Sequence, residues 1–376
     1  MRPARLVSAG AEMGNEPISL AGLLAAAPHR LLFLVGATNV LAAMTWWTCW
    51  LLAARWHLAE LPQPALPAGW LHAIIMQYQV LPSFIFGFLL TVFPRWMNLA
   101  PIAPRHYLPV GVGLLGGQLL TLAGLAGNPW LLRAGAAFTV AGWLVGLVLL
   151  SRRALQAPGW PWHALSCLLG LVFGFVGLGC YLLLTFRPDA QLAFVAIKFG
   201  GVAMLLPIYF TVCHRMIPFF TQMALPGYQP ARPLWVLAAA WVLLLTHLGL
   251  ELRHGYSWLW LADAPLACLF AGLLIAWWPR QKIPPLLRVL YLGFAWLPEE
   301  TILPELRAGQ LKALPLEGGA HRTAQLYASF ADPEFPGRDV ARLAEILRER
   351  AATACLKAKA APKGGRSRRS GKAARA

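Results

Sequence analysis

Apolar residues are gathered in long runs along the first 297 residues, and most polar residues lie in the short segments between these runs. A helix needs about 20 apolar residues to cross a bilayer, where only a helix or a closed barrel satisfies its backbone polar groups. Eight runs meet this length. They are Leu31–Ala54, Trp70–Phe93, Tyr107–Gly127, Trp130–Leu150, His163–Thr185, Gln191–Cys213, Pro233–Leu250 and Ser257–Trp278. A ninth run, Ile283–Leu297, stops about five residues short of a span. The pattern predicts an all-α, polytopic transmembrane helix bundle with eight full spans and a partial ninth.

The basic residues between these runs predict an orientation. Lys and Arg in short loops stay on the cytoplasmic side of a membrane. If the N-terminus is cytoplasmic, twelve basic residues lie inside and four lie outside. The inside set is Arg2, Arg5, Arg30, Arg95, Arg105, Arg152, Arg153, Arg215, Arg232, Arg280, Lys282 and Arg288, and the outside set is Arg55, Arg133, Arg187 and Arg253. We therefore expect a multi-pass protein of the cell inner membrane with a cytoplasmic N-terminus.

Composition narrows the class of protein further. Hydrophobic residues make up 58% of the chain and charged residues only 12%, about half the charged share of ordinary soluble domains. The net charge of +17 arises partly from eight Lys and Arg residues in the last 20 positions. The basic balance is thus partly a property of one tail, and we expect no nucleic-acid partner. The expected surroundings are the lipid bilayer, and the sequence predicts no oligomeric state.

The pattern changes after residue 297, where charged residues recur every three or four positions. Leu326–Phe330 is typical of a short strand, and Gly337–Arg350 is typical of an amphipathic helix. This predicts a short soluble C-terminal α/β fragment. We divide the chain into a cytoplasmic N-terminal segment (1–28), a transmembrane helical domain (29–297), the soluble fragment (298–356) and a disordered basic tail (357–376).

The second apolar run carries a pair of candidate metal ligands. His72 and Met76 are four positions apart, which places both on one helix face. Imidazole and thioether groups suit haem iron or copper. The alternative is that His72 reaches the membrane surface and Met76 packs in the core.

A second candidate stands where the sixth run ends. His214 could ligate a haem, and the planar fork of Arg215 suits a propionate carboxylate. Both residues could equally anchor the helix at the interface. His163 stands at the start of the fifth run, directly after Trp160-Pro161-Trp162. It resembles an aromatic-belt residue, and a ligand role is the weaker interpretation.

Two further ionisable residues fall inside predicted spans. Lys198 and His247 would be costly in lipid, which by default suggests a function. Lys198 could pair with a haem propionate or extend to the interface, and His247 is a further candidate metal ligand. Alternatively, Lys198, His247 and helix breaks near Pro82 and Pro207 could form the midplane site of a small-solute membrane transporter.

Several of these residues fall in motifs that resemble the NnrS family of bacterial membrane proteins. The resemblance rests on His72 with Met76, on Gly87–Trp96, on Arg215–Thr221 and on Leu290–Leu297, and it covers about residues 28–297. It implies haem, with copper as a second candidate metal, and a link to nitric oxide metabolism and nitrosative stress. The family is described with about twelve spans, so this chain is shorter.

This chain departs from the family's motif in the second apolar run. Many relatives read His-Ala-His-Glu-Met where this chain reads His72-Ala-Ile-Ile-Met76, so a histidine and a glutamate of that motif are absent. One metal position of the family is therefore in question here. The resemblance leaves His72 and His214 as candidate axial ligands at separate sites.

The C-terminal part resembles a different family. Residues 293–315 and 326–337 are similar to the end of the effector domain of a LysR-type regulator, without a helix-turn-helix. About 60 residues are too few to build that domain's two-lobed effector pocket. We expect no DNA binding and no regulation from them.

Overall fold

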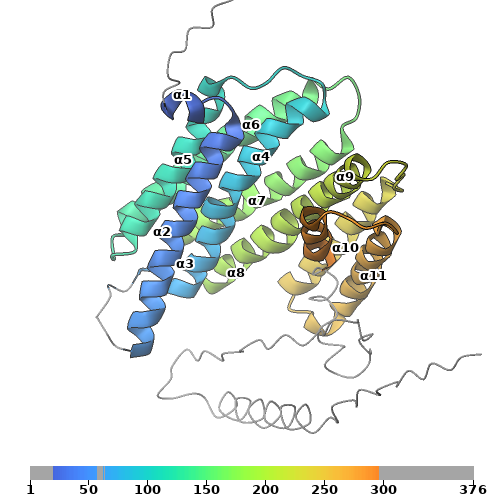
Figure 1. Ribbon diagram of the computed structural model, residues 1–376. Coiled ribbons are helices and arrows are strands. Elements are labelled where there is room, and N and C mark those ends of the chain that lie inside the picture. Colours follow the sequence, from blue (N-terminus) through green and yellow to red (C-terminus); the bar gives the residue numbers. More distant parts are fainter. Residues whose placement is uncertain (1–19, 57–61, 63, 296–376) are drawn as a thin grey trace, which may run out of the picture. The chain divides into compact units, whose positions relative to one another are not determined.

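The computed structural model describes residues 20–56, 62 and 64–295, which belong to one compact unit of the chain. Within these ranges the chain is helical and contains no strand (Figure 1). The elements are α1 (Leu20–Leu24), α2 (Pro28–Trp56), α3 (Ala68–Ile75), η1 (Met76–Val80), α4 (Leu81–Trp96), α5 (Pro104–Gly124), α6 (Pro129–Leu155), α7 (Trp162–Phe186), α8 (Ala190–Lys198), η2 (Phe199–Leu205), α9 (Leu206–Ala224), α10 (Trp235–Leu252), η3 (Tyr256–Trp258) and α11 (Trp260–Trp277).

The described residues contain eight helices that are long and apolar enough to cross a membrane, which confirms the predicted polytopic bundle. The shorter apolar helix Pro285–Ala295 corresponds to the predicted partial ninth span. The second span is α3, η1 and α4 in continuous succession, and the sixth is α8, η2 and α9. The strand and helix predicted after residue 297, residues 1–19 of the N-terminal segment and the basic tail lie outside the described residues.

Local signals explain where several helices begin. The side chain of Asn128 accepts hydrogen bonds from the backbone N–H groups of Trp130 and Leu131, and so caps the start of α6. Just before it, Gly127 adopts a positive φ of 95°, which permits the tight turn after α5. Asp189 caps α8 in the same way through the N–H of Leu192.

Both composite spans contain a π-helical segment directly before a Leu-Pro pair. The segment η1 precedes Pro82, and η2 precedes Pro207. Proline has no N–H to donate to the carbonyl four residues earlier. For Pro82 this is the carbonyl of Tyr78, which instead accepts a 2.9 Å hydrogen bond from the indole Nε1 of Trp143. The predicted breaks near these prolines are therefore widened helical turns, and the helices continue through them.

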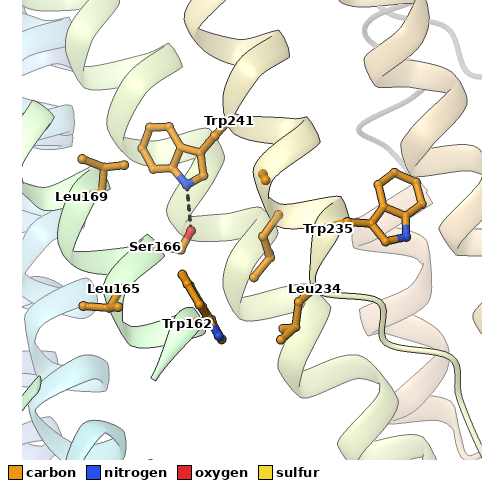
Figure 2. A pocket seen from close by; sticks show the side chains of 9 residues that line it. Trp162, Leu165, Ser166, Leu169, Leu234, Trp235 and Trp241 are labelled. Atoms are coloured by element: carbon orange, nitrogen blue, oxygen red, sulfur yellow. Dashed lines mark hydrogen bonds between the residues drawn. The ribbon is translucent and has the colours of Figure 1, made fainter. Parts of the chain in front are cut away.

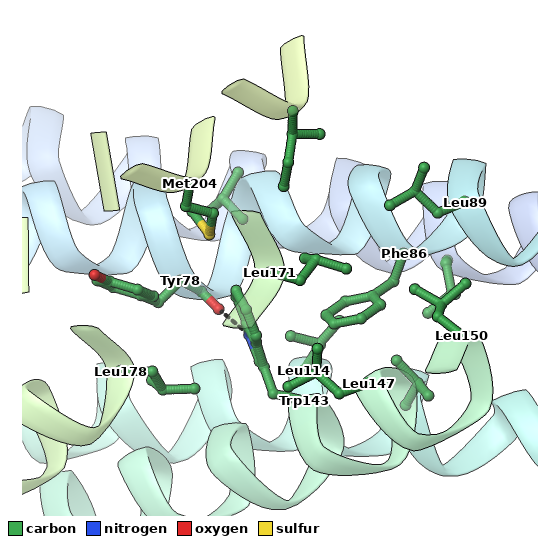
Figure 3. Close-up of a cluster of buried hydrophobic side chains, with 14 of the residues drawn as sticks. Tyr78, Phe86, Leu89, Leu114, Trp143, Leu147, Leu150, Leu171, Leu178 and Met204 are labelled. Carbon is green, nitrogen blue, oxygen red and sulfur yellow. Dashed lines mark hydrogen bonds between the residues drawn. The ribbon is translucent and has the colours of Figure 1, made fainter. Parts of the chain in front are cut away.

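Close packing between helices fixes this frame. Helices α5 and α6 meet at glycines, and a Cβ added to Gly113 would overlap the backbone of Gly142. Small residues of this kind let membrane helices approach closely. Figure 3 shows Phe86 and Trp143 edge to face in the adjacent core, with ring centroids 5.2 Å apart. This core holds the second span against α6 and α7.

The sixth span extends further than its hydrophobicity predicted. It ends at Ala224, whereas the apolar run ended at Cys213. His214 and Arg215 therefore lie within α9, more than two turns before its end, and not at the end of the helix where the apolar run stopped. The helix continues because Ile217 and Thr221 face the protein interior and bury that part of it.

Candidate functional site

Two histidines from different spans meet at the start of α7. Nε2 of His163 lies 3.0 Å from Nδ1 of His214, and the ring centroids are 5.2 Å apart. His163 stands in the first turn of α7, while His214 is in the middle of α9. We call these two residues the histidine pair. Sequence reasoning weighted His163 toward an aromatic-belt role, and the structure gives it a specific partner 51 positions away.

The second ring nitrogen of His214 makes no regular hydrogen bond. The residue is fully buried, and no acceptor meets both the distance and the angle that Nε2 requires, although the backbone of Pro233 lies close enough to act on the ring as a hydrogen-bond partner. Buried polar atoms are rarely left unpaired, because each one loses its contact with water without compensation. In metal-binding histidines, one nitrogen ligates and the other is held by a hydrogen bond that fixes the ring. His214 has this arrangement, with His163 as the holding group.

The surroundings of the histidine pair are cationic. Arg215 stacks its guanidinium on the ring of Trp96 at 4.6 Å and lines a pocket of about 330 Å³ together with His163. Arg232 is near enough for its charge to act on His163, His214 and Arg215. Among the described residues, no carboxylate lies within ion-pair distance of either arginine. The pocket therefore favours a ligand with a negative group.

One turn deeper, a second contact joins the same helices. The hydroxyl of Ser166 donates to Thr211 Oγ1 at 2.7 Å, since the Thr211 hydroxyl itself donates to the carbonyl of Pro207. Figure 2 shows the indole of Trp241 donating to Ser166, at the wall of an apolar pocket of about 440 Å³. The hydrogen bond between Ser166 and Thr211 fixes the spacing of α7 and α9 near the histidine pair, and so helps to set the distance between the two histidines.

His72 lies in a different part of the bundle. Its ring stacks on Trp47, with centroids 4.4 Å apart and an interplanar angle of 12°, and its buried Nδ1 has no hydrogen-bond partner. Met76 begins η1 one turn further on. The two positions where relatives carry histidine and glutamate are Ile74 and Ile75, and both are fully buried. In this chain both positions hold isoleucines that pack in the core.

His72 and His214 belong to separate sites. Helix α3, which carries His72, packs against α8 at the start of the sixth span. His214 follows Ala190 by 24 residues in that span, an axial separation on the order of 30 Å. One haem cannot bridge both residues.

Lys198 and His247 come together through two carboxylates that the sequence reasoning missed. Lys198 Nζ lies 2.6 Å from Glu251 Oε1, His247 Nε2 lies 3.4 Å from Glu251 Oε2, and His247 Nδ1 lies 2.6 Å from Asp263 Oδ1. We call these four residues the ionisable cluster. Both nitrogens of His247 face carboxylates, and Lys198 has its own counter-charge. The proposed cofactor sites therefore do not include either residue. The spacing of His247 and Glu251, four positions apart on one helix, was a signal that could have found the pair.

A buried network of uncharged polar residues surrounds η1. Gln79 donates to Thr121 Oγ1 at 2.8 Å and to Thr139 Oγ1 at 3.0 Å, Asn39 donates to the carbonyl of Gln79, and Gln118 donates to the carbonyl of Asn39. All five side chains are at most 1% exposed. Each is a polar residue inside an apolar run, and this feature of the sequence could have identified the members of the network. The network binds the second span to α2, α5 and α6.

Comparison with protein families decides the identity. A family model described as "NnrS protein" matches residues 23–321. The chain belongs to the NnrS family. No curated protein and no solved structure matches the chain. The match extends beyond residue 297 into the segment that resembled a LysR-type regulator, and no comparison supports that second resemblance for this NnrS-family chain.

Proposed function

We propose that this chain is a haem-binding protein of the bacterial inner membrane, with copper as the second candidate metal, and that it acts in nitric oxide metabolism and nitrosative stress. The proposal rests above all on the buried His214, whose Nε2 makes no regular hydrogen bond and whose partner His163 lines, together with Arg215, a pocket free of carboxylates. Membership of the NnrS family supports the same proposed function.

The donor set of the described residues favours haem over a lone metal ion. These residues contain no group of three or more His, Cys, Asp and Glu side chains that could hold a metal ion. A haem brings four nitrogen donors of its own and needs only one or two axial ligands from the protein. A single imidazole nitrogen supported by a second histidine is enough for that role.

Each residue of the site has a distinct task in this proposal. His214 offers Nε2 to the iron, and His163 fixes the ring through Nδ1. Arg215, held against Trp96, pairs with a propionate. A haem iron in such a position supplies reversible one-electron chemistry and a binding position for nitric oxide. The protein's own share is to orient the ligand, exclude water and neutralise the propionate charge.

His72 and Met76 form the second candidate site. The unpaired Nδ1 of His72 fits a ligand role, and the stacked indole of Trp47 holds the ring in place. Copper accepts both imidazole and thioether ligands. We therefore propose His72 with Met76 as the position for copper, or for a second haem.

Purified protein tests the proposal directly. We expect a Soret absorption band from the protein extracted in mild detergent, and metal analysis should give iron or copper bound per chain. His214→Ala should lower the iron content at least several-fold. His106→Ala is the matched control, because His106 is exposed on α5 and contacts neither site. A colourless, metal-free wild-type protein, produced in cells supplied with haem and copper, would refute the proposal.

A further inference from the structure

The ionisable cluster joins three membrane helices. Lys198 ends α8, His247 and Glu251 stand one turn apart near the end of α10, and Asp263 lies in the first turn of α11. Exposure of the side chains is 8% for Glu251, 20% for His247 and Asp263, and 29% for Lys198. Four ionisable groups thus lie inside segments that are otherwise apolar enough to span a bilayer.

The geometry around His247 determines how many protons it holds. A neutral imidazole has one N–H and one lone pair, whereas an imidazolium donates from both nitrogens. In a neutral ring, one lone pair would point at a carboxylate oxygen, at 2.6 Å from Asp263 or at 3.4 Å from Glu251. The 2.6 Å contact with Asp263 is a hydrogen bond, whereas the 3.4 Å approach to Glu251 is not, so the second carboxylate favours the imidazolium through its charge.

Charge balance gives the same result. With His247 neutral, two carboxylates face one lysine, and the cluster carries a net charge of −1. With His247 protonated the net charge is zero. An uncompensated charge is expensive inside a membrane helix. Among the residues that the structure describes, the charged groups that act on His247 are Lys198 on α8, Glu251 on α10 and Asp263 on α11.

The cluster has a short route to water. Asp263 is the fourth residue of α11, and the connection between α10 and α11 includes the exposed residues Arg253 and His254. His254 bonds to Tyr256 and packs against Phe194, and so does not belong to the cluster. Asp263, hydrogen-bonded to His247 and in the first turn of α11, is the carboxylate of the cluster that lies closest in sequence to this connection.

We propose that the ionisable cluster is a proton-binding site, independent of the haem proposal. One proton passes from water to Asp263 and then to Nδ1 of His247, which converts the cluster from a net charge of −1 to neutral. The second oxygen of Glu251 lies 3.4 Å from the opposite nitrogen of His247, and Lys198, 2.6 Å from the first oxygen, supplies the counter-charge of Glu251. The site therefore takes up one proton from the side of the membrane where α10 ends.

Histidine NMR tests this inference in the intact protein. Protein labelled with ¹⁵N at histidine, reconstituted in lipid bilayers, is compared between pH 5 and pH 9. At pH 8, where a histidine in water is almost wholly neutral, we expect an imidazolium signal from one residue. This signal should disappear in His247→Gln and persist in His254→Gln, the control at the same end of α10. Wild-type histidines that are all neutral at pH 8 would overturn the proposal, as would an imidazolium signal that survives in His247→Gln.

The carboxylates give a graded second test. Asp263→Asn should move the loss of the imidazolium signal at least one pH unit lower, and Asp263→Glu should restore it. The charge-conserving variant guards against a folding defect, because it retains the carboxylate at the same position. An equal shift in both variants would show that packing, and not the carboxylate charge, controls the proton.

Discussion

The histidine pair and the ionisable cluster place the same side chain in opposite surroundings. His214 has arginines nearby, no carboxylate within ion-pair distance among the described residues, and one nitrogen without a hydrogen bond. His247 lies between two carboxylates, with Nδ1 hydrogen-bonded to Asp263 and Nε2 3.4 Å from Glu251. A cationic environment disfavours the imidazolium and leaves a lone pair for a metal, whereas an anionic one favours a bound proton. The identity of the neighbours therefore assigns one histidine to a ligand role and the other to proton binding.

The largest effect should come from removing both members of the histidine pair. Because His163 lies 3.0 Å from His214, it can partly replace the lost ligand in the single variant His214→Ala. The double variant His163→Ala/His214→Ala should lose the cofactor of this site almost entirely, while the histidine NMR signal of the ionisable cluster is unchanged. Haem content per chain and NMR measured on the same preparation check this. Full cofactor content in the double variant would remove the distinction between the two regions.

A large effect on stability is expected in the ionisable cluster. Glu251→Ala leaves Lys198 without its counter-charge and should lower the free energy of unfolding by about 2 kcal/mol, less than for a fully buried pair because Lys198 is partly exposed. The double variant Lys198→Met/Glu251→Leu removes both charges and should regain much of that loss. Thermal unfolding in detergent compares the three proteins. A double variant as unstable as Glu251→Ala would show that the ion pair does not control stability here.

An effect shared by both regions should follow from disturbing the contact between α5 and α6. Gly113→Ala forces a Cβ against the backbone of Gly142, whereas a Cβ at Gly116 meets only the Phe138 ring at 3.4 Å. We expect Gly113→Ala to cost about 1–3 kcal/mol and to weaken haem binding and the imidazolium signal together. Gly116→Ala should be close to neutral in both measurements. A defect confined to one region would mean that the regions are supported separately.

Labelling of single cysteines should sharpen the comparison without changing stability. The positive-inside pattern puts residue 156, beside the start of α7, in the cytoplasm and residue 254, beside the ionisable cluster, outside. In a background without Cys355 and without Cys49 and Cys268, the cysteines exposed among the described residues, an impermeant maleimide added to intact cells should react with His254→Cys and not with Gln156→Cys. The reverse pattern would exchange the membrane sides of the two sites.

The spans could be predicted from the sequence because bilayer thickness acts locally. Each of the eight runs needed only length and hydrophobicity to be recognised, and each corresponds to a helical span. The predicted end of the sixth span was too early, because α9 continues beyond Cys213 with side chains that are buried in protein. The π-helical form of η1 also depends on a distant partner, since Trp143 takes the carbonyl that Pro82 leaves free.

The candidate site was less predictable, for the same physical reason. His214 could be selected from its motif, but its contact with His163 joins positions 51 residues apart through the packing of α7 on α9. Lys198 and Glu251 are 53 positions apart, and no local periodicity links them. Only His247 and Glu251, one turn apart on α10, were within reach of a spacing argument.

The central claim is that Nε2 of His214 ligates the cofactor, and exchanging the ligand tests it most directly. The variant His214→Met retains a metal-binding side chain but replaces imidazole with thioether, which alters the electronic properties of haem iron. The visible absorption spectra of reduced wild-type and variant protein are compared at equal haem content. The account predicts a displaced Soret band in His214→Met and an unchanged band in His106→Met. Superimposable spectra for wild-type protein and His214→Met would contradict it.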